Sequence, residues 1–348
     1  MTGVEALRGK VQTVNGLIDP GALGRTMMHE HLMIDLNPPR LRAEPAGPQD
    51  TLDLCDCFAV RWGRKHSRKN FQLDDRALAA SELARFRDAG GGTVVELTAG
   101  GLKPDPDALA AIAREAGVHV VMGCGHYVQE YQDPGNASRS ADDFAREIVG
   151  QVTGGAWGTS VRAGIIGEIG CQAPWTDGEK RVMRGALTAQ AETGAAVNVH
   201  PGRHPDQPGE VAAFARAAGA PMDRVIISHI DRTIFDADRL LRLADTGCVV
   251  ELDLFGWEQS NYSPDPGVDM PNDAVRLRWL RLLIDHGHGD RVLISSDICE
   301  RTRLCRYGGH GYGHILSNVV PFMLRRGFSE DEVETILVRT PARLLTFV

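Results

Sequence analysis

The chain has 348 residues, of which 43% are hydrophobic and 24% charged, and its formal net charge is -8. This is the composition of a globular protein with a sizeable core. The negative charge comes without a basic stripe, so we expect no nucleic-acid partner. No apolar stretch approaches the roughly 20 residues that span a bilayer, so we expect no membrane-embedded part.

The N-terminus and the cysteines indicate the cellular compartment in which we expect the protein. The first residues lack the basic start and apolar core of a secretory signal. The seven cysteines are an odd number without the spacing of a disulfide framework, which is typical of reduced thiols. We therefore expect a cytoplasmic protein.

The N-terminal quarter of the chain contains three predicted features. Residues 9–24 alternate apolar and polar side chains around Asn15-Gly16, which predicts a small β-hairpin. Residues 27–32 form a strand with a His-x-His pair at its end. The segment 37–72 is too long for a simple connection, so it is either a flap over a site or a solvated surface excursion.

From residue 74 onward the chain alternates between helical periodicity and short apolar runs. Such runs are typical of strands buried on both faces of a parallel sheet. Helices are predicted at 74–89, 106–116, 141–153, 177–193, 208–218, from 236, at 272–286 and twice after 300. With the His-x-His strand, the predicted strands are 27–32, 93–97, 118–123, 163–170, 196–200, 224–229, 248–254 and 291–297.

Eight strand–helix units predict an α/β fold, a (β/α)8 TIM barrel with a small N-terminal β-hairpin and an extra C-terminal helix. The rival is a doubly wound open sheet, but no Gly-x-Gly-x-x-Gly follows the first strand. We see no second domain, and expect residues 1–348 to form one barrel domain.

Potential metal ligands stand at the ends of several predicted strands. Alternate side chains of a strand share a face, so His29 and His31 project together while Glu30 points away. Taken singly, a strand-end His can bond a loop carbonyl and a strand-end Asp can cap a helix. Catalytic groups of this barrel, however, gather at the C-terminal strand ends. The set that we expect to bind metal there is His29, His31, Glu168, His200, His229 and Asp297.

Imidazole and carboxylate groups suit two divalent ions per chain. We expect Zn²⁺, with Mn²⁺ or Co²⁺ as alternatives. Glu168 has two oxygens and can bridge such a pair. The hypothesis is that a bridging hydroxide attacks the substrate and that Asp297 passes its proton to the leaving group, which makes Glu168 and Asp297 the catalytic carboxylates.

Five segments also stand out, in order along the chain. They are Gly-Ile-Ile-Gly-Glu-Ile-Gly-Cys (164–171), Val-Asn-Val-His-Pro-Gly-Arg (197–203), Ser-His-Ile-Asp-Arg-Thr (228–233), Ser-Ser-Asp-Ile-Cys (295–299) and Tyr-Gly-Gly-His-Gly-Tyr-Gly-His-Ile (307–315). Together they resemble the phosphotriesterase family of the amidohydrolase superfamily, and most closely its phosphotriesterase-related (parathion hydrolase-related) branch. The resemblance runs from about residue 9 to the C-terminus.

The resemblance implies a division of the ligands. His29, His31 and Asp297 would hold the more buried metal, and His200 and His229 the more exposed one. Organophosphate-degrading members bridge the metals with a carboxylated lysine. This chain has Glu168 there, as the phosphotriesterase-related branch does, which puts organophosphate hydrolysis in doubt as the natural activity.

The family includes lactonases, amidases and phosphotriesterases, and homodimers are common in it. We therefore expect a dinuclear-metal hydrolase of a small carbonyl substrate, a lactone or an N-acyl amide that can be anionic. The alternatives are a phosphotriesterase acting on organophosphate esters and a non-catalytic metal-containing protein that binds a ligand. A mononuclear deaminase is disfavoured because His200 is not followed by the Glu of a His-x-x-Glu motif.

Substrate specificity is expected in the loops that follow the strands. An Arg there suits a carboxylate, phosphate or sulfonate, although it can equally bind loop carbonyls or acidic helices. The candidate substrate-binding residues are Tyr127, Arg232, Trp257, Arg301, Arg303 and Tyr307.

Overall fold

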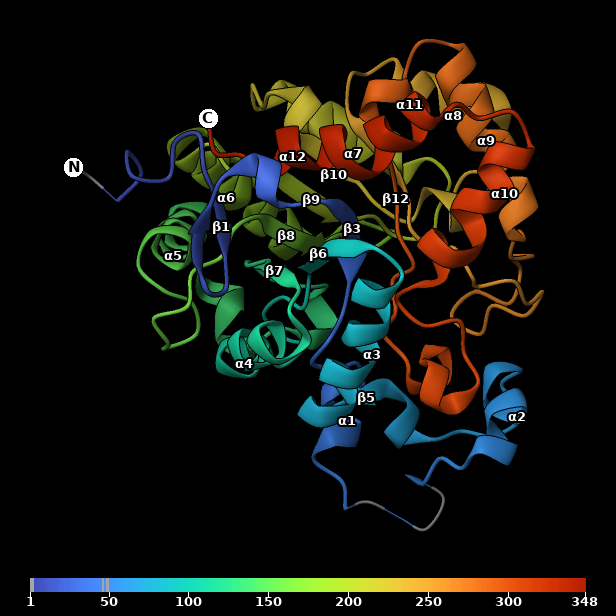
Figure 1. The fold of residues 1–348 in the computed structure, drawn as a ribbon. Helices are drawn as coiled ribbons and strands as arrows, with labels where there is room; N and C mark the ends of the chain where they lie inside the picture. Colours follow the sequence, from blue (N-terminus) through green and yellow to red (C-terminus); the bar gives the residue numbers. More distant parts are fainter. Residues whose placement is uncertain (1–2, 46, 48–49) are drawn as a thin grey trace.

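The computed structural model describes residues 3–45, 47 and 50–348. Eight parallel strands form the central barrel, and helices surround it (Figure 1). The strands are β3 (Arg25–Glu30), β6 (Gly91–Glu96), β7 (His119–Met122), β8 (Ile166–Gly170), β9 (Val197–His200), β10 (Val225–Ile227), β11 (Val249–Leu252) and β12 (Val292–Ile294). The predicted TIM-barrel fold is confirmed.

A helix follows each strand and returns the chain to the start of the next one. The connecting helices are α3 (Arg76–Asp88), α4 (Pro106–Ala116), α5 (Ala141–Thr153), α6 (Asp177–Thr193), α7 (Gln207–Ala217), α8 (Ala237–Ala244) and α9 (Asp273–Asp285). After β12 come two long helices, as predicted. The first runs from the π-helical turn Ile315–Val319 into α10 (Val320–Arg325), and the second runs from α11 (Glu330–Glu334) through the π-helical turn Thr335–Arg339 into α12 (Thr340–Leu345). The second begins at the predicted capping box of Ser329 and Glu332.

The barrel strands form two arcs, in which β3, β6 and β7 pair with one another and β8 to β12 form a five-stranded sheet. We call the two junctions between these arcs seams. At one seam the Gly167 N–H donates to the Cys124 carbonyl at 2.7 Å, and at the other the Asp297 N–H donates to the His29 carbonyl at 3.1 Å. The barrel is thus closed by isolated hydrogen bonds at the seams and by ladders elsewhere.

The barrel interior is a packed core. Met28, Val95, Val121, Ile226 and Leu293 belong to one buried apolar cluster, which comes from strands all around the ring. This cluster fills the barrel interior with apolar side chains, and the polar groups described below gather at the C-terminal strand ends. The predicted hairpin is also present, as β1 (Val11–Thr13) paired with β2 (Gly16–Ile18).

The segment 37–72 contains two short helices, α1 (Pro39–Arg42) and α2 (Cys57–Arg61), and positions 46, 48 and 49 of it lie outside the described residues. The strand β4 (Ile34–Asp35) before it pairs with β5 (Gln72–Leu73) at its end. In Figure 1 the segment lies beside the orange loop that follows β12. The side chain of Asn70 joins the two by accepting the Thr302 N–H at 3.0 Å.

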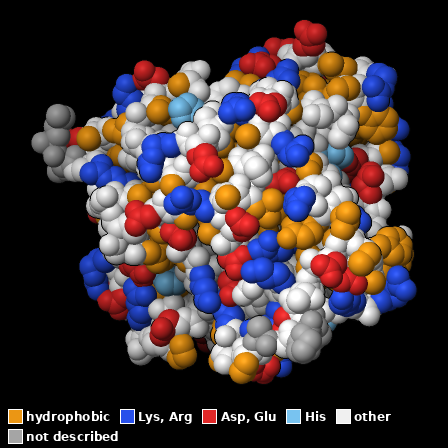
Figure 2. Space-filling view, turned by 60° about the horizontal axis from the view of Figure 1, so that its bottom comes forward, with side chains coloured by type: hydrophobic (Ala, Val, Ile, Leu, Met, Phe, Trp, Pro, Cys, Tyr) orange, Lys and Arg blue, Asp and Glu red, His pale blue; other side chains and the backbone are white. Residues whose placement is uncertain are grey.

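Basic and acidic side chains are interspersed over the end of the molecule that carries α1 and α2, as Figure 2 shows. None of the helices in the described part of the chain combines the length and apolar character needed to cross a bilayer.

Candidate active site

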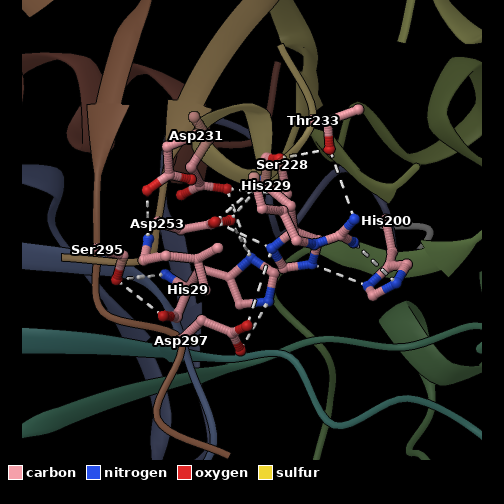
Figure 3. Close-up of polar contacts among 12 residues, drawn as sticks. His29, His200, Ser228, His229, Asp231, Thr233, Asp253, Ser295 and Asp297 are labelled. Carbon is pink, nitrogen blue, oxygen red and sulfur yellow. Dashed lines mark hydrogen bonds and ion pairs between the residues drawn. The ribbon is translucent and has the colours of Figure 1, made fainter. Parts of the chain in front are cut away.

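The six predicted ligands converge at the C-terminal end of the barrel. His29 lies in β3, Glu168 in β8 and His200 at the end of β9, while His31, His229 and Asp297 stand just beyond β3, β10 and β12. Figure 3 shows His29, His200, His229 and Asp297 pointing toward one another. All except Asp297, whose side chain is 12% exposed, are buried.

Glu168 occupies the centre of the cluster. Its Oε2 atom lies 2.7 Å from His200 Nδ1, 3.3 Å from His229 Nε2 and 3.6 Å from His29 Nε2. Its Oε1 atom lies 3.7 Å from His31 Nε2. One carboxylate therefore faces both histidine pairs, which is the geometry that a bridging ligand requires.

The donor set fits divalent metal ions. The Nε2 atom of His29, which faces the cluster, is buried without a hydrogen-bond partner. His200 Nδ1 and His229 Nε2 lie 2.8 Å apart, so their lone pairs repel unless a cation or proton lies between them. Nitrogen and carboxylate oxygen are the ligands that Zn²⁺ takes in proteins. His29–His31–Glu168, Glu168–His200–His229 and His29–His229–Asp297 each place their ligand atoms within 4.8 Å of one another.

The charges of the cluster are strongly coupled. Burial would raise the pKa of Glu168, but His200, His229 and His29 hold that pKa well below its usual range. Burial lowers the pKa of His200 to about 3, so its imidazole is neutral and keeps a free lone pair. The Asp253 carboxylate overcomes the effect of burial at His229 and raises the pKa of that ring to about 9.

Two further carboxylates support the cluster, and the sequence analysis missed both. Asp253 Oδ1 lies 2.9 Å from His229 Nδ1, and Asp253 Oδ2 lies 3.1 Å from His29 Nδ1. Glu251 accepts hydrogen bonds from Ser228 and Asn198, both at 2.8 Å. A carboxylate on the far nitrogen of a ligand His fixes its tautomer and orientation. The signal was present, because two acids alternate in the otherwise apolar run 248–254.

Two of the predicted ligands have an unusual backbone conformation. His229 has φ +56° and Asp297 has φ +43°, in the left-handed region that residues other than glycine rarely adopt. Such residues persist where surrounding contacts hold them, and they concentrate at functional sites.

The predicted substrate-binding residues lie in three places. Tyr127 Oη and Arg232 Nη2 lie 3.4 Å and 3.3 Å from His200 Nε2, beside the cluster. Arg303 stacks on Trp257, with the guanidinium carbon 3.9 Å from the ring centre. Arg301, in contrast, is bound by the Gln72 carbonyl, Asp74 and Tyr307. Its donors and the Tyr307 hydroxyl are thus engaged within the protein.

A cavity of about 670 Å³ opens beside the cluster. His200, Tyr127 and Arg203 line it from the barrel, and Asn37, Pro38, His66 and Phe71 line it from the segment 37–72. This volume suits a small-molecule ligand. Since the segment lines the cavity, its position favours the flap over the surface excursion.

A TIM barrel that gathers four histidines and two carboxylates at its C-terminal end is the architecture of a metal-dependent hydrolase. The sequence profile of the phosphotriesterase family matches residues 9–345. The chain belongs to this family.

Several known proteins are similar over their full length. The N-acetyltaurine hydrolase of Bos taurus is 41% identical over 99% of this chain and 100% of its own length. The structure of a resiniferatoxin-binding protein from Rhodobacter sphaeroides has a TM-score of 0.91 at 34% identity, covering 99% of this chain and 98% of that chain. The phosphotriesterase homology protein from Escherichia coli, solved with phosphate in its active site, has a TM-score of 0.78 at 27% identity. The match covers 94% of this chain and 100% of that chain.

Proposed function

We propose that this protein hydrolyses the amide bond of a small N-acylated amine that carries an anionic group, and that N-acetyltaurine is the first substrate to test. The observation that carries the proposal is full-length similarity at 41% identity to an N-acetyltaurine hydrolase. The buried cluster around Glu168 is the part of the molecule suited to this chemistry. The reaction adds water across the C–N bond, giving a carboxylic acid and an amine.

The six converging residues would hold two divalent ions, with Zn²⁺ expected and Mn²⁺ or Co²⁺ as alternatives. His29, His31 and Asp297 would hold one ion and His200 and His229 the other. Glu168 would lie between them, since its oxygens are within 3.7 Å of all four rings. When bound, such a pair polarises a carbonyl group and lowers the pKa of water toward ~7.

The chain's own groups would divide the remaining work. Asp297 is the partly exposed carboxylate of the cluster, so it can accept a proton from the attacking water and deliver it to the departing nitrogen. Asp253 holds His229 with its Nε2 atom toward Glu168. Tyr127 lines the cavity next to His200, where its hydroxyl can orient the substrate.

The same experiment should also test two other substrate classes, lactones and aryl phosphotriesters, and the alternative that the protein binds a ligand without turning it over. Lactones and aryl phosphotriesters share the electrophilic centre that such a site attacks. The similarity to a protein named for binding resiniferatoxin favours including a pure binder. If the protein hydrolyses any ester or amide, and a metal chelator abolishes this activity, the protein is not a pure binder.

We also propose a cytoplasmic homodimer. All seven cysteines are free thiols, as a reducing compartment requires. The exposed rings of Phe58, on α2, and Trp62, just after its end, lie 6.1 Å apart and offer an apolar contact. Light scattering at several concentrations would give the oligomeric state.

The test combines metal content with activity. Wild type and Glu168→Ala would be analysed for metal per chain and assayed on N-acetyltaurine, lactones and aryl phosphotriesters. The control is Glu115→Ala, on the exposed face of α4. We expect about two ions in wild type and control, fewer in Glu168→Ala, and amide hydrolysis that follows metal content. One ion or none in wild type, or no amide hydrolysis, would refute the proposal.

A further inference from the structure

Arg303 is a buried cation that forms no ion pair within the described residues, although the charge of Glu300 acts to raise its pKa. Its side chain is 3% exposed, and within the described residues its guanidinium makes neither an ion pair nor a hydrogen bond. Its Nε atom is fully buried. Burying an unpaired charge is costly, so proteins normally pair or neutralise it. Here burial lowers the pKa of Arg303 to about 10, which leaves the group protonated at neutral pH.

Other buried arginines of this protein show the usual arrangement. Arg276 donates to Asp231 and Asp273, and Arg301 donates to Asp74. Arg224 binds four backbone carbonyls, those of Gly194, Arg343, Leu344 and Thr346. Arg224 leaves only its Nε atom without an acceptor, whereas the whole Arg303 guanidinium lacks one within the described residues.

Two other unpartnered nitrogen atoms lie near Arg303. The indole Nε1 of Trp257, the ring on which Arg303 stacks, is buried without a hydrogen-bond partner, and so is Nε2 of His310. The His310 ring packs against Gly256, where an added Cβ would lie 2.6 Å from it. His310 Nδ1 faces the Gly311 carbonyl at 3.3 Å, so its Nε2 atom carries a lone pair and is not a donor. The Arg303 guanidinium and the Trp257 indole, in contrast, offer N–H groups without acceptors. Such groups side by side form a site for oxygen atoms of a ligand.

The surrounding contacts hold this site in place. Arg276 donates to the Trp257 carbonyl at 3.1 Å and to Asp231 at 2.6 Å, so the Trp257 loop is tied to the loop after His229. Gly309 packs directly on Arg303, where a Cβ would lie 2.1 Å from the Arg303 carbonyl carbon. The guanidinium and the indole are therefore preorganised.

The site lies between the metal-ligand cluster and the segment 37–72. Arg303 stands in the same loop after β12 as Asp297, and the helical turn Arg301–Arg303 contacts both α2 and the turn Arg68–Phe71 of the segment 37–72. Arg61 of α2 is close enough to Arg303 to lower its pKa. A substrate with its scissile bond at Glu168 and Asp297 could thus direct its far end toward Arg303.

We propose that Arg303, stacked on Trp257, binds the terminal oxyanion of the substrate and so selects anionic amides over neutral ones. The inference rests on the proposed amide hydrolysis and deepens it. A guanidinium presents a planar set of donors that matches a sulfonate or a carboxylate, and the aromatic face fixes its plane. The two anions share this chemistry, and the substrates chosen below separate them.

The test compares Arg303→Met and Arg303→Lys with wild type and with Arg306→Met, an exposed arginine of the same loop. The substrates are N-acetyltaurine, N-acetyl-β-alanine and the neutral N-(2-hydroxyethyl)acetamide. Arg303→Met should lower kcat/KM for the preferred anionic amide roughly 10- to 100-fold, mainly through KM, and change the neutral amide less than about threefold. The kcat/KM of Arg303→Lys for the anionic amide should lie between those of Arg303→Met and wild type. The kcat/KM values of Arg306→Met should match those of wild type.

A structural role for Arg303 makes a different prediction. Removing a buried arginine that holds the fold together lowers Tm, whereas removing an unpaired buried charge leaves Tm unchanged or raises it. We expect the second result. If Arg303→Met does not fold, Trp257→Phe replaces it, and the same loss of discrimination is expected.

Calorimetric measurement of ethanesulfonate binding separates the proposed amide hydrolysis from the proposed anion site at Arg303. If wild type hydrolyses the amides but Arg303→Met keeps the same preference for anions, this inference fails and the proposed function stands. If wild type hydrolyses none of them yet binds ethanesulfonate in an Arg303-dependent way, the proposed function fails and the anion site stands. Absence of both hydrolysis and binding overturns both.

Discussion

The carboxylate of Glu30 accepts the backbone N–H of Ile298 at 2.9 Å, across the seam between the first and last barrel strands. It also accepts the Ser296 N–H at 2.8 Å and the Ser295 hydroxyl at 2.9 Å. The strand that carries His29 and His31 thereby fixes the segment that carries Asp297.

Glu30→Ala should therefore impair both stability and activity. It leaves two buried backbone N–H groups without an acceptor, while the Ser295 hydroxyl can still donate to the His29 carbonyl at 2.8 Å. We expect the free energy of unfolding to fall by about 2–4 kcal/mol. Activity should fall because Asp297 loses its support. Urea denaturation and kcat would be measured together, with the exposed Glu115→Ala as control. A Glu30→Ala protein with wild-type stability and kcat would contradict this role.

Asp253→Asn should weaken metal binding without removing a ligand. Asp253 contacts the far nitrogens of both His229 and His29, so an amide in its place loses the negative charge and turns its NH2 donor toward one of the two rings. Loss of such a supporting carboxylate costs about 10- to 100-fold in metal affinity. Competition against a chromophoric chelator would measure the change, with the exposed Asp238→Asn of α8 as control. Equal affinities in the two variants would show that Asp253 does not support the site.

Arg276→Met should destabilise the protein strongly. The Arg276 guanidinium lies 2.6 Å from Asp231 and 2.9 Å from Asp273, and it is fully buried. Removing one partner of a buried pair leaves the other charge uncompensated, at a cost of about 3–5 kcal/mol. Denaturant unfolding would test this against Arg278→Met, an exposed position on the same helix. The double variant Arg276→Met, Asp231→Asn should recover part of the loss, and a lack of recovery would argue against charge as the cause.

The ion pair of Arg281 with Glu332 should stabilise the fold only above acidic pH. Arg281 Nη1 and Nη2 lie 2.8 Å and 3.0 Å from the two oxygens, and this contact lowers the pKa of Glu332 to about 2. A carboxylate with a lowered pKa in the folded state stabilises above its unfolded pKa, and the effect is lost as pH falls toward the folded value.

We therefore expect Glu332→Gln to be less stable than wild type by about 0.5–1 kcal/mol at pH 7, because the pair is partly exposed. The difference should shrink progressively below pH 4.5, the usual pKa of this carboxyl. Chemical denaturation at a series of pH values would measure it. A difference that is constant down to pH 3 would mean that the charge of Glu332 contributes nothing.

The sequence was sufficient to predict the convergence of His29, His31, Glu168, His200, His229 and Asp297. Parallel strands of a barrel all end on one rim, so a strand-end position already determines the neighbourhood of a side chain. The hairpin at 9–24 and the capping box at Ser329 were equally predictable, because they depend on local chemistry alone.

The role of each loop arginine was not predictable. Arg301 and Arg303 are separated by one residue and have the same chemistry. Arg301 meets Asp74 and the Gln72 carbonyl, at the end of a segment distant in sequence, while Arg303 meets only an aromatic face. Asp253 was overlooked for a related reason, because its importance depends on two rings from other strands.

The two-arc construction of the barrel has a further consequence. His29 and His31 belong to the three-stranded arc, whereas Glu168, His200, His229 and Asp297 belong to the five-stranded arc or its loops. Neither arc therefore contains all six of the proposed metal ligands. A folding intermediate in which only one arc has formed therefore lacks part of the proposed metal site. The complete set of ligands is assembled only when the two arcs join and the barrel closes.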